Sequence, residues 1–143
     1  MPSAVSQSDT YGTAIADYAI DGDEKTEAHT QCAKNTDFWY KMKFDSVNCF
    51  SDVVIINSKY LNDLRYRMSH TKVLVINRET EIENLCGLVG VSDVPTIEGQ
   101  TYRIPCDLKC GDEVKLTLRH DSSNYTREAC IHIYEITTFL TGQ

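Results

Sequence analysis

The chain has 143 residues, of which 41% are hydrophobic and 24% are charged, as expected of one folded globular domain and not of a disordered segment. Its 14 lysines and arginines face 21 aspartates and glutamates, and the formal net charge of -7 disfavours nucleic acid and anionic membrane surfaces as partners. The longest apolar runs, such as "VVII" at 53–56, fall far short of the roughly 20 residues of a membrane-spanning helix, so membrane insertion is not expected.

The predicted elements begin with a short helix or turn between Tyr11 and Ala19. An acidic loop, "DGDEKTE" at 21–27, follows, and its glycine allows the tight bend that such a loop needs. Long loops on a rigid scaffold carry functional residues more often than short ones do. The longest irregular segments are 21–37, 57–70 and 119–128.

Helical periodicity is weak throughout, and the other segments alternate between apolar and polar residues or are rich in β-branched residues. In chain order the predicted strands are "WYKMKF" (39–44), "DVVIIN" (52–57), "TKVLVIN" (71–77), "QTYRIPC" (100–106), "EVKLTLRH" (113–120) and "CIHIYEI" (130–136). Val114, Leu116 and Leu118 face one way and the polar residues between them the other, as in a half-solvated antiparallel strand. The sequence therefore predicts one all-β domain over 1–143, an antiparallel β-sandwich.

The cysteines are even in number and show no repeated Cys-x-x-Cys pattern: Cys32, Cys49, Cys86, Cys106, Cys110 and Cys130. This usage favours disulfides and an oxidising compartment, so secretion is expected. An alternative is a zinc site built from Cys106, Cys110 and either His132 or Cys130, although this spacing matches no zinc finger or knuckle.

Several short motifs follow one another in a particular order: "AIDG" at 19–22, "HT" at 29–30 before "FWY" at 38–40, "SDVVIIN" at 51–57, "RMSHTKVLVI" at 67–76, "CG" at 86–87, "GQT" at 99–101 and the strand from Cys130. This order resembles the F-type lectins, or fucolectins, over nearly the whole chain. The resemblance implies a jelly-roll sandwich of the galactose-binding-domain-like type and a secreted module that binds fucosylated glycans.

The resemblance also implies two disulfides. One joins Cys86 to Cys106, and the other joins Cys130 to the cysteine beside the histidine. Here that cysteine is Cys32, three residues after His29 instead of two before it.

Cys49 and Cys110 are left over, since no bond of the family accounts for them. We expect them to pair with each other and to tie the start of a central strand to the loop before "EVKLTL"; buried free thiols are the alternative. Each of the expected bonds would stabilise the fold by about 2–4 kcal/mol, mainly through the unfolded state.

A neutral sugar is held by converging hydrogen bonds to its hydroxyls and by an apolar wall for its C–H face. Members of the family use a histidine, an Arg-x-Asp and a second arginine, and His29 and Arg67 match the first and last of these by their neighbours. The loop "NSKYLNDLRYR" (57–67) is two residues longer than usual and lacks the Arg-x-Asp. The predicted site therefore uses His29 and Arg67 as donors, Lys59 as an added donor, Asp63 as acceptor and orienter of Arg67, and Tyr60 as the apolar wall; ordinary solvated loop residues are the alternative.

The family carries a structural calcium ion beside its site, so the resemblance implies one Ca²⁺ here. By position its ligands are the Tyr18 carbonyl, Asp21, Asp23, Thr26 and the Cys130 carbonyl. Calcium takes about six to eight oxygens, and the carboxylate that the family places after the last cysteine is replaced by Ile131. Glu24, Glu27 or water would have to compensate, and an acidic loop without metal is the alternative.

These features predict a secreted lectin whose partners are glycans or glycoproteins, fucosylated ones among them, with a diverged sugar-binding loop. Catalysis is not expected, because His120, Asp121 and Ser122 are adjacent in one loop instead of converging with separate roles. Homo-oligomerisation would add avidity to a weak single site.

Two other classes stay open. The chain could be a non-catalytic protein-recognition module on a lectin scaffold that has lost fucose binding, with Tyr60 and Tyr66 as buried anchors. A discoidin-like binder of membranes or collagen would use Tyr60, Leu61 and Leu64, but the net charge of -7 opposes binding to anionic lipid.

Overall fold

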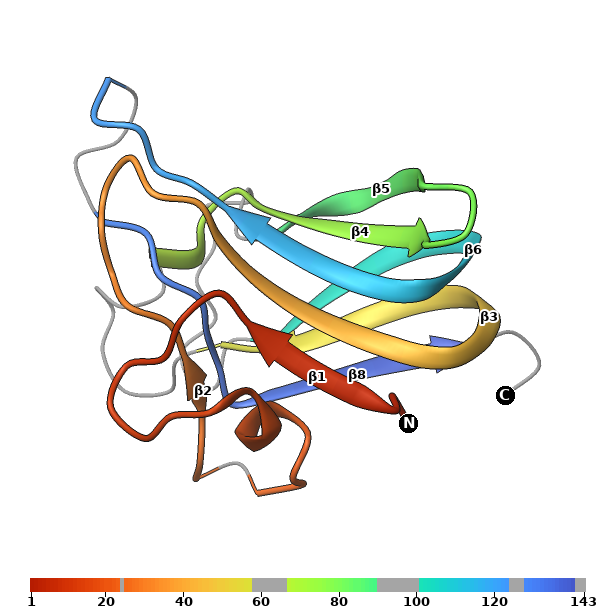
Figure 1. Ribbon diagram of the computed structural model, residues 1–143, viewed down its shortest axis with the longest axis horizontal. Coiled ribbons are helices and arrows are strands. Elements are labelled where there is room, and N and C mark those ends of the chain that lie inside the picture. The colour runs from red at the N-terminus through yellow and green to blue at the C-terminus, as the bar shows by residue number, and fades with distance from the viewer. Residues whose placement is uncertain (24, 58–66, 90–100, 124–127, 141–143) are drawn as a thin grey trace.

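The computed structural model describes residues 1–23, 25–57, 67–89, 101–123 and 128–140. Its strands are β1 (Ala4–Gln7), β2 (Ala28–His29), β3 (Phe38–Ile56), β4 (Thr71–Asn77), β5 (Ile82–Val89), β6 (Thr101–Leu118), β7 (His132–Ile133) and β8 (Glu135–Leu140), and the 3-10 helix η1 (Ala16–Ala19) lies between β1 and β2. The pairings between these strands are antiparallel, and the strands stack in two layers (Figure 1). The all-β antiparallel fold predicted from the sequence is confirmed.

Strands β3 and β6 belong to both layers, because each of them curls over at one end of the sandwich (Figure 1). The first half of β3 pairs with β1, its second half pairs with β8, and β6 follows its other edge in both halves. Segments 39–44 and 52–57 were predicted as separate strands but form one, and so do 100–106 and 113–120. Apolar alternation shows that residues are extended, but it does not show whether the chain between two extended segments turns or continues.

An irregularity in β3 keeps both of its halves facing the core. Its pairing with β6 shifts register between Phe50 and Asp52. Successive side chains of a strand point to opposite faces, so one extra residue moves the following set to the other face. The buried residues change accordingly from even to odd positions: Phe38, Tyr40, Met42, Phe44 and Phe50, then Val53 and Ile55.

All six cysteines form disulfides, in the pairs expected above: Cys32–Cys130, Cys49–Cys110 and Cys86–Cys106. No thiolate is therefore left for the alternative zinc site. The position of Cys49–Cys110 differs from the expectation, since both residues lie within strands and stand directly opposite each other in the β3–β6 ladder. Cys86–Cys106 joins β5 to β6.

The C-terminal segment 130–136, predicted as one alternating strand, is split between β7 and β8. Ile131, His132, Ile133 and Tyr134 are all buried, so this stretch does not alternate between core and solvent. β7 leaves the main sheet and pairs with β2 in a small second sheet at one end of the sandwich (Figure 1). Among the described residues, none forms a helix with the length and apolar character to cross a membrane.

Candidate functional site

The β2–β7 ladder fixes the position of His29. Ala28 stands opposite Ile133 and His29 opposite His132, and the backbone N–H of Thr30 donates to the Ile131 carbonyl at 2.8 Å. The buried Thr30 hydroxyl accepts the Ile131 N–H at 3.0 Å. On the other side of β2, the His29 N–H donates to the Ala14 carbonyl at 3.0 Å. His29 is thus held on a strand with backbone hydrogen bonds on both sides, although its segment was predicted to be irregular.

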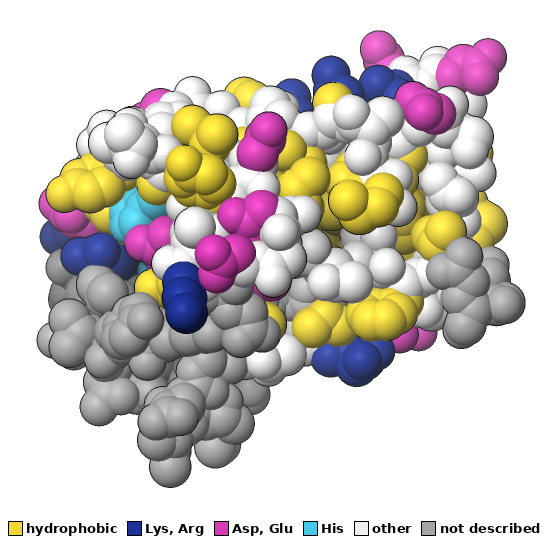
Figure 2. Space-filling model, turned by 90° about the horizontal axis from the view of Figure 1, so that it is seen from below, with side chains coloured by type: hydrophobic (Ala, Val, Ile, Leu, Met, Phe, Trp, Pro, Cys, Tyr) yellow, Lys and Arg dark blue, Asp and Glu magenta, His cyan; other side chains and the backbone are white. Residues whose placement is uncertain are grey.

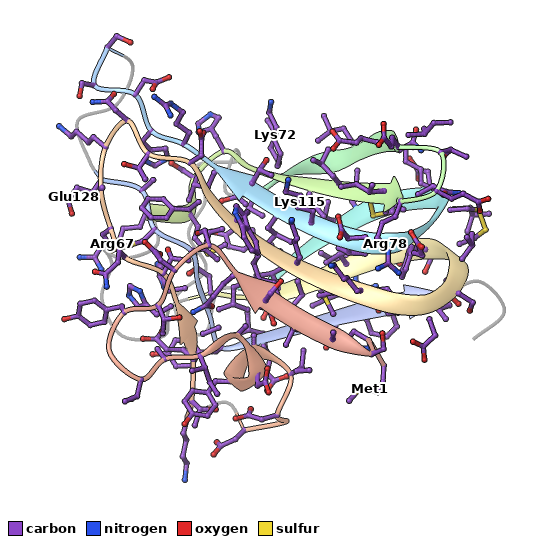
Figure 3. All side chains as sticks on the ribbon, viewed as in Figure 1. Met1, Arg67, Lys72, Arg78, Lys115 and Glu128 are labelled. Atoms are coloured by element: carbon purple, nitrogen blue, oxygen red, sulfur yellow. A yellow bond between two sulfur atoms is a disulfide. The ribbon has the colours of Figure 1, made fainter. Side chains whose placement is uncertain are left out.

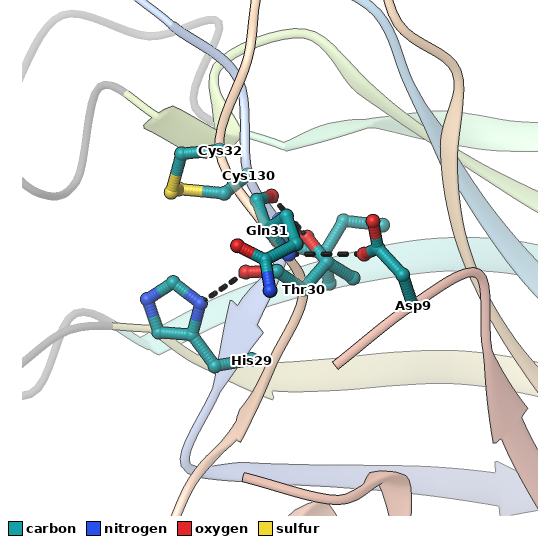
Figure 4. Close-up of a disulfide and its surroundings, with 7 residues drawn as sticks. Asp9, His29, Thr30, Gln31, Cys32 and Cys130 are labelled. Atoms are coloured by element: carbon teal, nitrogen blue, oxygen red, sulfur yellow. Dashed lines mark hydrogen bonds between the residues drawn. A yellow bond between two sulfur atoms is a disulfide. The ribbon is translucent and has the colours of Figure 1, made fainter. Parts of the chain in front are cut away.

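The His29 ring has a defined tautomer. Its Nδ1 lies 2.5 Å from the Thr30 carbonyl oxygen, which can only accept, so Nδ1 carries the proton (Figure 4). In the neutral imidazole Nε2 is then a hydrogen-bond acceptor. With Nδ1 engaged by Thr30, Nε2 is the ring nitrogen left to face a ligand, and the sugar-binding role of His29 stays a prediction.

Arg67 lies at the same end of the molecule, away from Lys72 on β4 (Figure 3). Its carbonyl accepts the Cys130 N–H at 3.2 Å, which ties it to the segment that leads into β7. The next residue, Met68, is fully buried, and its carbonyl accepts the Thr71 hydroxyl at 2.6 Å. The sequence-predicted pair of His29 and Arg67 is therefore brought to one end of the sandwich by two well-anchored backbone segments.

Glu27 is a third residue to consider here, because His29 and Arg67 both influence the pKa of its carboxyl. In the sequence it was considered only as a compensating calcium ligand. Burial raises the pKa of its carboxyl, while the charges of His29 and Arg67 oppose that rise. The pKa of the Glu27 carboxyl therefore depends on both His29 and Arg67. The spacing in the sequence could have predicted this, because Glu27 precedes His29 by two residues. Side chains two residues apart on an extended segment face the same side.

The Cys32–Cys130 disulfide lies next to His29. A ring nitrogen of His29 and both sulfur atoms lie within 4.8 Å of one another. Because the sulfurs are bonded to each other, they are not thiolate ligands, and this group is not a metal site. Cys32 is half-buried and Cys130 fully buried, so only the Cys32 side of the disulfide reaches the surface beside the imidazole (Figure 4).

The surface at this end carries mixed chemistry. Figure 2 shows a histidine side chain exposed among hydrophobic side chains, with acidic and basic side chains close by. Lys59, Tyr60 and Asp63, the other predicted sugar-binding residues, lie outside the described residues.

The acidic loop holds several oxygen atoms close together. The Thr26 hydroxyl bonds the Asp21 carboxylate at 2.5 Å and the Asp23 carbonyl at 3.0 Å, and the Asp23 N–H donates to Asp21 at 2.9 Å. The hydrogen bond from Thr26, and after it the one from the Asp23 N–H, lower the pKa of Asp21. A hydrogen bond with Glu135 lowers this pKa further. Tyr18 belongs to η1, just before this loop.

The register of β2 and β7 separates Cys130 from these oxygens. With Ala28 opposite Ile133, the chain beyond Ile133 runs toward Thr26, whereas Cys130 lies on the far side of His29. Glu135 is the acidic residue that reaches the loop, and it lines one groove with Asp21. Glu135 is therefore an acidic residue beside Asp21 that the expected ligand set did not contain, and that set itself stays a prediction.

His120, Asp121 and Ser122 are engaged in separate structural bonds. The buried His120 bonds the Ser69 carbonyl through Nε2 at 2.8 Å, Asp121 pairs with Arg119 at 2.7 Å, and the Ser122 N–H donates to Asn35 at 2.9 Å. The three side chains do not converge on one point.

Comparison with solved structures finds the same architecture in three proteins that bear lectin or sugar-binding names. The chain matches a fucolectin from striped bass (Morone saxatilis) serum with a TM-score of 0.74 and 17% identity, over 96% of this chain and 45% of that one. It matches the lectin domain of lectinolysin, solved with Lewis b antigen, with a TM-score of 0.73 and 18% identity, over 97% and 93%. A fucose-binding module of Streptococcus pneumoniae matches with a TM-score of 0.70 and 14% identity, over 95% and 92%.

No protein-family model matches the chain, and no curated protein matches it in sequence. The chain spans less than half of the fucolectin's length. At these identities the comparisons establish a shared fold, and the activity has to be argued from the site.

Proposed function

We propose that residues 1–143 form one extracellular, non-catalytic domain that binds glycans or glycoproteins. The observation that carries this proposal is the position of His29 beside the Cys32–Cys130 disulfide, with the Arg67 carbonyl hydrogen-bonded to the Cys130 N–H, at one end of the sandwich. Such a site combines charged hydrogen-bonding groups with an apolar surface, which is the combination that a sugar ring requires. The three disulfides fit an oxidising, extracellular environment.

Each group has a distinct proposed role. The planar guanidinium of Arg67 donates to two neighbouring hydroxyls, which an ammonium group could not do with the same geometry. Nε2 of His29 accepts from another hydroxyl, and Glu27 accepts from a hydroxyl while it orients Arg67. The disulfide contacts the C–H face of the sugar. Lys59, Tyr60 and Asp63 complete the proposed site on the strength of the sequence alone.

The test is binding of labelled, multivalent protein to a broad glycan array, with fucosylated glycans included. We expect Arg67→Ala and His29→Ala to reduce the signal at least tenfold, since hydrogen bonds to charged groups contribute about 1.5–3 kcal/mol each. Lys72→Ala is the matched control, because Lys72 is an exposed cation on β4, away from the site. No glycan signal for the wild-type protein would refute the function and favour a protein-recognition module.

We also propose that one Ca²⁺ binds at the acidic loop, through oxygens of Asp21, Asp23, Thr26 and Glu135, with the Tyr18 carbonyl as a further candidate. Carboxylate, carbonyl and hydroxyl oxygens are the ligands that calcium prefers. A hydrogen bond with Glu135 is among the causes that lower the pKa of Asp21, so the two side chains lie close together. A bound cation would hold both carboxylates in place of that proton and would brace β2, next to the sugar site.

Calcium binding is tested by thermal unfolding with and without added Ca²⁺. We expect the ion to raise the melting temperature of the wild-type protein, because a ligand that binds only the folded state stabilises it. Glu135→Gln should abolish the rise, whereas Glu128→Gln, an exposed acid outside the loop, should retain it. An equal rise in both variants would place the ion elsewhere.

A further inference from the structure

Tyr11 is an exposed aromatic residue that contacts the candidate site. Its side chain is 59% exposed, while its ring lies against His29 with the centroids 5.1 Å apart and the planes tilted by 37°. The other face of this small cluster is buried, because His29 also stacks on the buried His132 at 5.5 Å. The Tyr11 ring therefore packs on the His29–His132 pair and is otherwise largely exposed to solvent.

The backbone that carries Tyr11 is fixed by hydrogen bonds to β2 and its flanks. The Tyr11 N–H donates to the His29 carbonyl at 2.9 Å. Gln31 donates from its side chain to the Thr10 carbonyl at 2.9 Å and from its backbone to Asp9, also at 2.9 Å. Gln7 adds side-chain hydrogen bonds to Thr10 and to the Ala14 and His29 carbonyls. Little conformational entropy would be lost if a ligand packed on this ring.

The Tyr11 ring and the Cys32–Cys130 disulfide contact His29 in different ways. The disulfide sulfurs lie within 4.8 Å of a ring nitrogen, whereas Tyr11 packs against the imidazole ring itself. Tyr11 therefore offers an exposed aromatic face for a second sugar ring, next to the ring proposed at His29.

We propose that Tyr11 forms a second subsite, which stacks on the C–H face of a sugar ring adjacent to the one held by His29 and Arg67. The ligand class is then an oligosaccharide of at least two rings and not a free monosaccharide. This inference rests on the proposed carbohydrate-binding function. The hydroxyl of Tyr11 is not needed for stacking, so phenylalanine should replace it without loss.

The experiment compares affinities for a monosaccharide and for an oligosaccharide that contains it, by calorimetry on the intact chain. The probes are L-fucose against the Lewis b oligosaccharide, and D-galactose against lactose. The proteins are the wild type, Tyr11→Ala, Tyr11→Phe and Phe139→Ala. Phe139 is the matched control, since it is an aromatic residue that is 40% exposed on β8 and packs against Arg103.

We expect Tyr11→Ala to weaken oligosaccharide binding about 3- to 10-fold, as aromatic stacking contacts do, and to leave monosaccharide binding unchanged. Tyr11→Phe and Phe139→Ala should match the wild type for both probes. An equal loss for both probes in Tyr11→Ala would place Tyr11 in the primary site and overturn the inference, and so would no loss for either. If the wild-type protein binds none of the probes, the proposed function fails and the inference fails with it.

Discussion

Removing the Cys32–Cys130 disulfide should destabilise the fold and disable the site together. The bond spans 98 residues, and in the chain-entropy description an isolated loop of that length would contribute about 4.7 kcal/mol. The structure lowers this value, because Cys49–Cys110 is nested inside the same loop. With Cys49–Cys110 intact, the loop that the Cys32–Cys130 bond closes runs through segments 32–49 and 110–130, which is roughly 38 residues. For a loop of that length the same expression gives about 3.9 kcal/mol.

The variant is the double replacement Cys32→Ser and Cys130→Ser, measured by urea unfolding under conditions that keep the other two disulfides oxidised. We expect the free energy of unfolding to fall by about 4 kcal/mol. Glycan binding should fall as well, because the Cys130 N–H holds the Arg67 carbonyl at 3.2 Å and the disulfide lies beside His29.

The matched control is the double replacement Cys86→Ser and Cys106→Ser, which opens a bond that spans 20 residues between β5 and β6. It should cost about 3.3 kcal/mol by the same expression but leave glycan affinity unchanged where the protein is folded. A loss below about 1 kcal/mol for the first variant, or equal effects of the two on glycan affinity, would refute the reasoning.

Three further predictions test the packing and the electrostatics. Burial raises the pKa of Glu27 above 4.5, so the folded state holds the proton of this carboxyl more tightly than the unfolded state does. The free energy of unfolding of the wild type should therefore fall as pH rises from about 4.5 through the raised pKa. Urea unfolding across this range should show no such loss in Glu27→Gln. Gly111→Ala should cost about 2–3 kcal/mol or more in the same assay, because a Cβ there would lie 2.5 Å from the Ile76 carbonyl oxygen. Gly22→Ala should cost only about 1 kcal/mol, because Gly22 has open space around it and only its φ of +76° opposes a side chain. Equal losses in the two variants would contradict this account. Thr30→Val should cost about 1–3 kcal/mol, since it leaves the buried Ile131 N–H without its acceptor at 3.0 Å; an unchanged melting temperature would show that this bond is dispensable.

The sequence predicted the extended segments better than the strands they form. Segment 71–77 is found as β4 with the predicted bounds, but β1 and β5 were not predicted. β5 is an edge strand with exposed apolar side chains, so its residues do not follow the alternation that burial on one face imposes. β1 is only four residues long, too short for a pattern to be distinguished from chance.

A similar limit applies to the candidate site. His29 and Arg67 were found through their neighbours in the sequence, and the structure brings them to one end of the sandwich. The roles proposed for Glu27, Tyr11 and Glu135 depend on interactions across the fold, because the three residues come from different segments. A single sequence carries little information about such pairs, since their separation along the chain is unrelated to their distance in space.

By itself, the sequence determined the fold class and the oxidised cysteines, because these follow from local alternation, residue type and neighbouring motifs; His29 and Arg67 stay its predictions for the site. Only the tertiary structure decided that β3 and β6 cross between layers, that Cys49 faces Cys110 within the ladder, and that Glu135 and not Cys130 reaches the acidic loop. These facts depend on register between distant segments. A shift of one residue changes every partner in a ladder while leaving the local pattern of each strand the same.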